Sequence, residues 1–280
     1  MRIAFRVDAS IVIGSGHVMR CLSLAEYLKD NGADVFFICR KYPGDLIKKI
    51  IKKGFQVFEL KETGNSKFDT KLFHSHWLGV SQKIDAFESK EILVRIKPNW
   101  LVVDHYALDQ EWEKELKHIS GKIMVIDDLA DRKHDCDILL DQTCGRKQKH
   151  YTNLVPKTCR LIVGAQYSLL RPEFLEWRRY SLKRRVNPEL KSLLISMGGV
   201  DDQNHTEDVL HQLMLCSLPN QFKITVVLGA LAPHLDSVTI KAKQLSCEVI
   251  IKVDVDNMAE IMANSDAAIG AAGTTSWERC

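Results

Sequence analysis

The sequence lacks three features that would each assign it to a particular class of protein. Its eight cysteines form no Cys-x-x-Cys pair, which disfavours a structural zinc site and a secreted disulfide framework. No apolar run approaches the roughly 20 residues that a membrane-spanning helix needs. The net charge is only +3, which does not indicate a nucleic-acid-binding surface. With Arg2, Arg6 and Asp8 at its start the chain has no signal-peptide pattern, so we expect a soluble cytoplasmic protein without nucleic-acid or membrane partners.

Short apolar runs alternate along the chain with amphipathic stretches, a pattern typical of a mostly parallel sheet covered by helices. With 280 residues and 45% hydrophobic content, the chain is long enough for two domains. A helix is predicted over residues 17–31, where Gly32 provides a fitting stop. Strands are predicted at residues 3–7, 35–39, 56–59, 101–103, 123–126, 138–140, 161–163, 192–196, 224–228, 249–253 and 267–270.

Each predicted half opens with a strand, a glycine-containing loop and a helix. We therefore expect an α/β fold of two Rossmann-like domains facing each other across a cleft, with both loops at the carboxyl ends of their sheets. The expected division is a first domain over residues 1–176, a linker over 177–191 and a second domain over 192–280. The basic run in the linker is interpreted as a solvated connector. The second domain looks incomplete, because the chain stops at Cys280 where a helix should be starting.

The loop after the first strand, residues 13–20 (IGSGHVMR), carries the most chemistry. Gly14 and Gly16 let the backbone turn sharply and approach a ligand. The helix that follows offers unpaired N–H groups and a positive dipole end, which suits an anion. His17 stands at that helix start and can change its charge near neutral pH. The combination predicts chemistry on a phosphorylated substrate.

A dinucleotide site is the first alternative for this loop. The dinucleotide fingerprint needs a third glycine, but Met19 stands at that position. Arg40, at the end of the second predicted strand, could instead suit the 2′-phosphate of NADP. An NADP-dependent oxidoreductase is therefore one hypothesis to test.

A set of short motifs occurs in order along the chain and is more specific than any one of its members. The motifs are FRVDAS at 5–10, IGSGH at 13–17, RCL at 20–22, VDHY at 103–106, IDDLADR at 126–132, DILLDQ at 137–142, YSLLR at 167–171 with Glu173 and Phe174, MGG at 197–199, and GTTSWE at 273–278. Together they resemble the UDP-2,4-diacetamido-2,4,6-trideoxy-β-L-altropyranose hydrolases of pseudaminic acid biosynthesis. That resemblance implies a fold of the B-type glycosyltransferase kind.

The resemblance also implies an activity and its residues. The expected reaction is metal-independent hydrolysis that releases UDP with inversion at the anomeric carbon, with no cofactor and no obligate protein partner. His17 matches the family's catalytic histidine and would take the proton from water. The substrate-binding residues implied in this way are Arg6, Asp8, Gly14, Gly16, Arg20, Tyr106, Gly198, Gly199, Thr274 and Glu278. Among them, Gly198 and Gly199 would form a diphosphate loop, and Glu278 would accept from the ribose hydroxyls.

Some of these residues have a structural interpretation as well. Arg6 and Asp8 could form a turn network instead of contacting the sugar or orienting His17. Tyr106 could serve packing alone. Asp127 and Asp128 end a predicted strand, where they could contact the sugar or shape the loop.

Two other patterns give weaker signals. Asp135 and Asp137 have the Asp-x-Asp spacing of metal-dependent glycosyltransferases, without supporting ligands. His74 and His76 could lie on one side of a strand, but no third metal ligand accompanies them, so an exposed loop is expected there.

Two further functions remain open at this point. A glycosyltransferase would share the architecture, so fold cannot separate it from a hydrolase. A non-catalytic nucleotide-binding fragment would also fit a second domain that looks incomplete.

Overall fold

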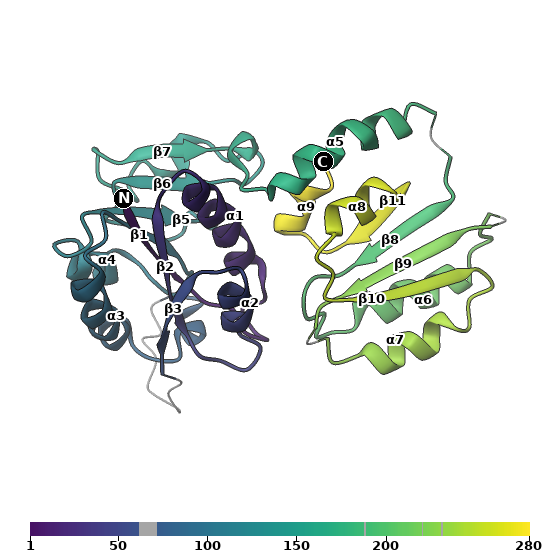
Figure 1. The fold of residues 1–280 in the computed structure, drawn as a ribbon, viewed down its shortest axis with the longest axis horizontal. Helices are drawn as coiled ribbons and strands as arrows, with labels where there is room; N and C mark the ends of the chain where they lie inside the picture. The colour runs from purple at the N-terminus through teal and green to yellow at the C-terminus, as the bar shows by residue number, and fades with distance from the viewer. Residues whose placement is uncertain (62–71, 188, 220, 231) are drawn as a thin grey trace. The chain divides into compact units, whose positions relative to one another are not determined.

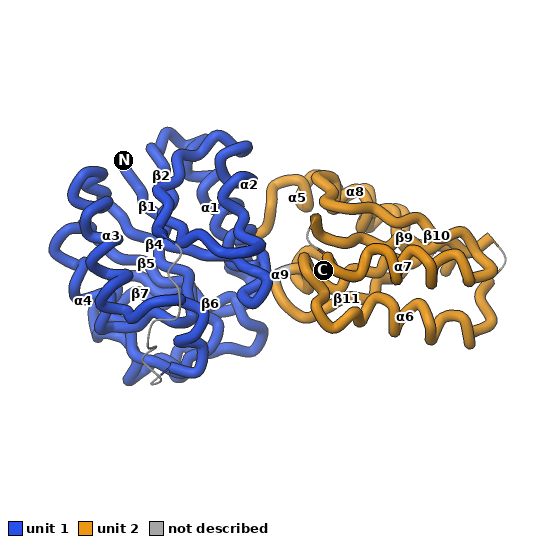
Figure 2. Tube along the Cα trace, turned by 90° about the horizontal axis from the view of Figure 1, so that it is seen from below, with its two compact units in different colours: residues 1–169 blue, residues 170–280 orange. Residues whose placement is uncertain are grey.

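The computed structural model describes residues 1–61, 72–187, 189–219, 221–230 and 232–280. Within the last range, it describes the backbone of Thr274 but not its side chain. It divides into two compact units, Met1–Leu169 and Leu170–Cys280 (Figures 1 and 2). Each unit is a parallel sheet with helices on both faces. Within the described ranges, no helix is both long and apolar enough to cross a bilayer.

The first unit contains a seven-stranded sheet in the order β3-β2-β1-β4-β5-β6-β7. All its strand pairs are parallel. The central strands read as nearly continuous apolar runs because both faces of the sheet are covered. The strands are β1 (Arg2–Val7), β2 (Asp34–Arg40), β3 (Gln56–Leu60), β4 (Trp100–Asp104), β5 (Lys122–Ile126), β6 (Ile138–Asp141) and β7 (Arg160–Val163).

Helices cover the two faces of this sheet in pairs (Figure 1). On one face, α1 (Gly16–Asp30) and α2 (Ile47–Lys52) bury side chains such as Val18 and Ile50. On the other, α3 (Gln82–Ile96) and α4 (Gln110–Leu116) bury Leu93 and Trp112. The described part of the unit also contains three short 3₁₀ turns: η1 (Ser75–Leu78), η2 (Gln148–Tyr151) and η3 (Ala165–Tyr167).

The strand order of the first unit reverses between β1 and β4. From β1 the chain builds outward through β2 and β3, and it then returns to the other side of β1 with β4. The two strands pair in parallel register, with Val7 beside Asp104. In open parallel sheets, ligands bind outside the carboxyl ends of the strands at such a switch point. The loops that follow β1 and β4 are therefore where a site is expected.

The second unit repeats this plan with a four-stranded parallel sheet in the order β10-β9-β8-β11. Helices α6 and α7 cover one face, and α5 and α8 the other (Figure 1). The switch point lies between β8 and β11. The elements are α5 (Pro172–Arg184), β8 (Ser192–Ser196), α6 (His205–Met214), β9 (Lys223–Leu228), α7 (Leu235–Ala242), β10 (Glu248–Val253), α8 (Met258–Ala263), β11 (Ala267–Gly270) and α9 (Thr274–Glu278).

The boundary between the units differs in detail from the expected division. The structure divides the chain at Leu169 and Leu170, and much of the expected linker is helical, since α5 extends to Arg184. Its basic residues have partners in the second unit: Arg184 lies 2.5 Å from Asp266, and Arg185 donates to the carbonyl oxygen of Met262 at 3.0 Å. A cation is favourable beside the carbonyl end of a helix, here α8. These contacts explain why this charged run is ordered.

Candidate active site

His17 lies in the first turn of α1, close to the carboxyl end of β4. Its Nδ1 atom lies 2.6 Å from Oδ1 of Asp104, the last residue of that strand. The His17 side chain is 9% exposed and the Asp104 side chain is fully buried. With Nδ1–H donated to the carboxylate, Nε2 is the nitrogen that can accept a proton. Nε2 has no hydrogen-bond partner among the described residues.

Arg20, one turn further along α1, holds the same carboxylate in place. Its Nε and Nη2 atoms donate to the two oxygens of Asp104 at 2.6 and 2.7 Å. Its Nη1 donates to Asp128. Burial by itself raises the pKa of Asp104, but Arg20 and His17 outweigh burial and keep the pKa of this carboxyl well below its usual value. Asp104 is therefore ionised at neutral pH and can stabilise a protonated His17.

Tyr106, two residues after β4, stands beside the imidazole. The ring centroids of His17 and Tyr106 are 4.5 Å apart and nearly perpendicular. The Tyr106 hydroxyl donates to Oδ2 of Asp128 at 2.9 Å. Burial and the Asp128 carboxylate raise the pKa of Tyr106, so the phenol keeps its proton and acts as a donor. The structure thus brings together four residues singled out from the sequence: His17, Arg20, Tyr106 and Asp128.

The loop between β1 and α1 presents backbone donors beside His17. Gly14 has a φ of 79° and its N–H donates to the carbonyl oxygen of Ser10 at 2.8 Å, which closes a tight turn. A side chain would be strained in that left-handed conformation. The N-cap residue Ser15 makes no side-chain cap, and the first turn of α1 carries no acidic side chain. The N–H groups at Gly16 and His17 are therefore available to an anion.

Arg6 and Asp8 lie in a separate buried network. The Arg6 guanidinium contacts Asp85 through Nε at 3.1 Å and Nη2 at 2.6 Å, and contacts Asp8 through Nη1 at 2.6 Å. Asp8 also accepts from the backbone N–H of Arg40 at 2.7 Å and lies 3.2 Å from Nε2 of His105. All these side chains are almost fully enclosed. The geometry matches the structural interpretation of Arg6 and Asp8, a network that joins β1, β2 and α3.

The same network removes the feature that favoured NADP. The Arg40 guanidinium is fully buried and donates to Asp85 at 2.7 Å and to Glu88 at 2.6 Å. It is therefore not presented to a 2′-phosphate, and the NADP interpretation of Arg40 is wrong.

Asp127 and Asp128 have different surroundings. Asp127 is fully buried and shapes the loop after β5: it accepts from the N–H of Ala130 at 2.9 Å, from Arg132 at 2.8 Å and from Tyr151 at 2.8 Å. Asp128 faces Arg20 and Tyr106 instead, and its side chain is 21% exposed. Of the pair, only Asp128 belongs to the surroundings of His17.

In the second unit, Gly198 and Gly199 lie in the loop after β8, at the switch point of that sheet. Gly198 has a φ of 101°, and a Cβ there would meet no atom within 4 Å. A Cβ on Gly229 would lie 1.9 Å from the carbonyl oxygen of Gly199, so the loops after β8 and β9 pass very close together. The start of α6 is already capped, because the Asp201 carboxylate accepts from two of its backbone N–H groups at 2.9 Å each. These two N–H groups are therefore not available to a ligand.

Glu278 is the last residue of α9, which follows β11 at the same switch point. Its Oε1 accepts from Nη2 and Nε of Arg171 at 3.1 and 3.3 Å, and its side chain is 12% exposed. Burial raises the pKa of Glu278, and Arg171 opposes that shift. Helix α9 begins at Thr274, whose side chain lies outside the described residues, so its predicted contact stays a prediction.

The remaining candidates from the sequence have other roles. Asp135 lies 2.5 Å from Lys117, and Asp137 accepts from the backbone N–H of Ile123 at 2.9 Å. Among the side chains that the structure describes, no group of three or more His, Cys, Asp and Glu residues is arranged to hold a metal. His74 and His76 flank the start of η1 and do not share a strand. His74 lies near the site, with its ring 5.3 Å from that of Tyr106.

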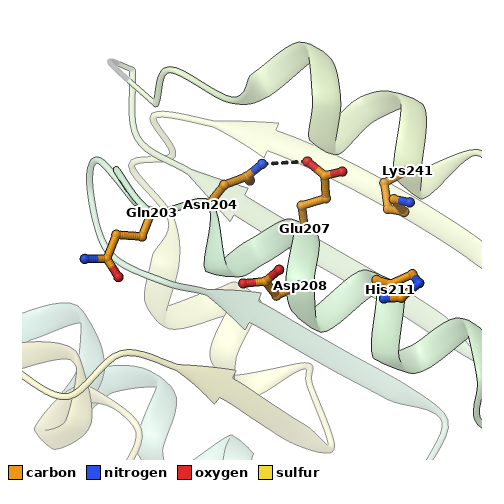
Figure 3. Close-up of a pocket in the computed structure, with 6 residues that line it drawn as sticks. All are labelled: Gln203, Asn204, Glu207, Asp208, His211 and Lys241. Atoms are coloured by element: carbon orange, nitrogen blue, oxygen red, sulfur yellow. Dashed lines mark hydrogen bonds between the residues drawn. The ribbon is translucent and has the colours of Figure 1, made fainter.

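The second unit also has an open hollow of about 490 Å³ over α6 (Figure 3). It is lined by Gln203, Asn204, Glu207, Asp208, His211 and Lys241. Figure 3 shows Asn204 donating to Glu207, at 2.5 Å. None of the predicted site residues lines this hollow, and its carboxylates do not favour an anionic ligand.

Two residues beside His17 were not identified from the sequence. Asp104 stands inside a matched motif and ends a predicted strand, so its place at the carboxyl edge of the sheet was a usable signal. Trp77 gave no such signal, because it lies in a short 3₁₀ turn far from His17 in the chain. Its ring centroid is 6.1 Å from that of His17.

Comparison with known proteins tests the resemblance directly. No protein-family profile matches the chain. An uncharacterized protein of Methanocaldococcus jannaschii is 29% identical over 283 residues, which is 99% of this chain but only 53% of that protein, so the chain spans about half the length of this relative. The UDP-2,4-diacetamido-2,4,6-trideoxy-β-L-altropyranose hydrolase of Campylobacter jejuni is 29% identical over 270 residues, 96% of this chain and 84% of the hydrolase. The spore coat polysaccharide biosynthesis protein SpsG of Bacillus subtilis is 23% identical over 284 residues, 99% of this chain and 74% of SpsG.

Solved structures share the fold. MurG of Acinetobacter baumannii matches with a TM-score of 0.58 at 12% identity, over 98% of this chain and 74% of MurG. The UDP-GlcNAc 2-epimerase of Neisseria meningitidis matches with a TM-score of 0.54 at 11% identity, over 98% of this chain and 78% of the epimerase. The expected Rossmann-like α/β domains of the B-type glycosyltransferase kind are therefore confirmed. The resemblance read from the ordered motifs is confirmed as well: the chain is a relative of the UDP-diacetamido-trideoxy-altropyranose hydrolase and of SpsG.

Proposed function

We propose that this chain hydrolyses UDP-2,4-diacetamido-2,4,6-trideoxy-β-L-altropyranose and releases UDP. One observation carries the proposal: the His17 imidazole is held by Asp104 at the switch point of the first sheet, with Nε2 left without a partner among the described residues. The similarity to the Campylobacter hydrolase supports the choice of substrate.

In the proposed reaction, His17 acts as a general base. Nε2 takes one proton from a water molecule while the water oxygen forms a bond to the anomeric carbon. The bond between that carbon and the diphosphate oxygen breaks, and its electron pair leaves with UDP. Asp104 keeps Nδ1 protonated and stabilises the imidazolium, as a buried carboxylate does for other histidine bases.

No general acid is required in this scheme. Diphosphate is a good leaving group at neutral pH, whereas ordinary inverting glycosidases pair a carboxylic acid with a carboxylate base. Backbone donors can instead receive the developing charge. In the first unit, the N–H groups at Gly16 and His17 are suited to this task because no side chain caps them.

The nucleotide is assigned to the second unit. Gly198 and Gly199 would approach the diphosphate through their backbone, and Glu278 would accept from the ribose hydroxyls. Glu278 is suited to this role because Oε1 is on Arg171 while Oε2 has no partner among the described residues. We also propose that the hydrolysis needs no metal ion.

The experiment is an assay of UDP release with neither metal nor acceptor added. The native chain should release UDP, and a His17→Ala variant should bind UDP but not release it from the sugar. If release by the native chain required an added acceptor, the same base would serve a transferase. If neither protein released UDP, the proposed hydrolysis would be wrong for this sugar.

A further inference from the structure

We infer that Trp77 is a sugar-recognition residue, which holds an acetamido-bearing sugar beside His17. The inference rests on the proposed function and adds a specificity-determining residue to it.

Trp77 belongs to a cluster of aromatic rings next to the catalytic imidazole. Its ring is stacked on that of Tyr106, with centroids 5.6 Å apart and planes 25° apart. The His17 ring stands roughly perpendicular to both, at 78° to Trp77 and 83° to Tyr106. His74 packs against Trp77 at 4.5 Å. Trp77 is thus near the reacting centre without taking part in the proton transfer.

The backbone fixes Trp77 in this place. Its neighbours Leu78 and Val80 are 1% and 2% exposed and anchor the turn in the core. Between them, Gly79 has a φ of 71°, and a Cβ there would lie 2.8 Å from the hydroxyl of Tyr42. A site that holds its ligand through a rigid ring loses little entropy on binding.

The cluster partner Tyr106 is fixed as well. Its hydroxyl is bound to Asp128, and the guanidinium of Arg132 lies over its ring at 5.7 Å from the centroid. The two stacked rings are therefore held in place beside His17.

The indole N–H of Trp77 is available as a donor, unlike that of the fully buried Trp112. The buried Trp112 donates its Nε1–H to Asp85 at 3.0 Å. Trp77 is only partly buried, and its Nε1–H has no acceptor among the described residues. Tryptophans in binding sites use this combination of a large apolar ring and one donor.

An acetamido group matches both parts of Trp77. Its methyl group can pack on the ring, and its carbonyl oxygen can accept from Nε1–H. A UDP-linked sugar with two acetamido groups and a deoxy carbon offers more apolar surface than a sugar with hydroxyls alone. We therefore assign to Trp77 the binding of the sugar, and no contact with UDP.

The test compares three variants: Trp77→Ala, Trp77→Phe and, as a control, Trp177→Phe. Trp177 lies in α5 of the second unit, is also partly buried, and packs on Tyr180 at 5.4 Å. For each variant and for the native sequence, the Kd values for UDP and for the UDP-linked diacetamido sugar are measured by calorimetry with the His17→Ala substitution also present, so that the sugar is not hydrolysed, and the change in tryptophan fluorescence is recorded.

Trp77→Ala should weaken binding of the nucleotide sugar about 10- to 100-fold and raise KM, with the Kd for UDP unchanged. Trp77→Phe should lose less affinity because it keeps a ring, and both variants should lose the fluorescence change that the sugar produces. Trp177→Phe should behave as the native chain. Equal Kd values for the nucleotide sugar in Trp77→Ala and the native chain would overturn the inference, as would a parallel loss of UDP affinity.

These outcomes separate the inference from the proposed function. If the native chain releases UDP but Trp77→Ala binds the sugar normally, the inference fails alone. If the native chain binds the nucleotide sugar through Trp77 without releasing UDP, the hydrolysis fails and the recognition role stands. If the native chain does not bind the nucleotide sugar, both are wrong.

Discussion

Nδ1 of His17 lies 2.6 Å from Oδ1 of Asp104, although 87 positions separate the two residues in the chain. The parallel pairing of β1 with β4 brings them together, since His17 lies in the helix that follows β1 and Asp104 ends β4. This contact favours Nδ1 of His17 as the protonated nitrogen and leaves Nε2 without a partner among the described residues, as the proposed base requires.

Replacing Asp104 by Asn should therefore impair catalysis more than binding. The amide cannot stabilise the imidazolium, and it no longer fixes Nδ1 as the protonated nitrogen. We expect kcat to fall by roughly 10²- to 10⁴-fold, the range of a general-base contribution, with the Kd for UDP little changed. The measurement is steady-state UDP release with calorimetry of UDP binding.

Asp131→Asn is the matched control for this change. Asp131 is a nearby carboxylate that is 48% exposed and forms an ion pair with Arg132. The kcat of the Asp131→Asn variant should equal that of the native chain. A kcat for Asp104→Asn within a few-fold of the native value would show that His17 does not depend on Asp104.

The sequence predicted most of the fold, because parallel strands covered on both faces are read directly as short apolar runs. All eleven predicted strands are present, and each bound lies within one residue of the expected one. The helical part of the expected linker was missed, since the charged side chains of α5 resemble a solvated segment until their partners on α8 and at Asp266 are known.

The site was predicted less completely. His17, Arg20 and Tyr106 were identified by motif, and the structure brings them together. The roles of Arg6 and Asp8 depend on Asp85, which lies in α3 and has no motif of its own. The position of Trp77 beside His17 depends on the path of the loop that carries it, and the local sequence pattern does not encode that path.

Arg6→Ala should destabilise the fold. The substitution leaves the buried carboxylates Asp8 and Asp85 without their main counter-charge, and breaking a buried ion pair in this way costs about 3–5 kcal/mol. The free energy of unfolding of the variant and of the native chain is measured by urea denaturation. Arg178→Ala, at an exposed position in α5, should change it by no more than about 0.5 kcal/mol. A similarly small change for Arg6→Ala would mean that the network does not stabilise the first unit.

The free energy of unfolding should decrease in two stages as the pH is lowered. Burial lowers the pKa of His105, so the unfolded chain binds this proton more readily than the folded one. The contribution of His105 to the free energy of unfolding is present above the pKa of about 6.5 that it has in the unfolded chain. This contribution is lost as the pH falls through its lower pKa in the folded chain.

The aspartates should cause the second stage. Burial opposes ionisation of Asp8 and Asp104, but their arginine partners Arg6 and Arg20 dominate and lower the pKa of both carboxyls. Their contribution is present above the unfolded value of about 4 and is lost at lower pH. Urea midpoints measured from pH 8 to pH 3 check both stages, and a midpoint that rises on acidification would contradict them.

Glu278→Gln should weaken nucleotide binding. The amide loses the charged pair with Arg171 and is a poorer acceptor for two ribose hydroxyls. We expect the Kd for UDP to rise about tenfold, measured by calorimetry against Glu176→Gln at an exposed position in α5. An unchanged Kd would remove Glu278 from the nucleotide site.

We propose that His17 activates water at the anomeric carbon of a UDP-linked diacetamido sugar. The most direct measurement is UDP release from that nucleotide sugar by the native chain and by His17→Ala, without metal or acceptor, with UDP binding measured for both. We expect release by the native chain only, and similar UDP affinity in the two proteins. Normal release by His17→Ala would contradict it.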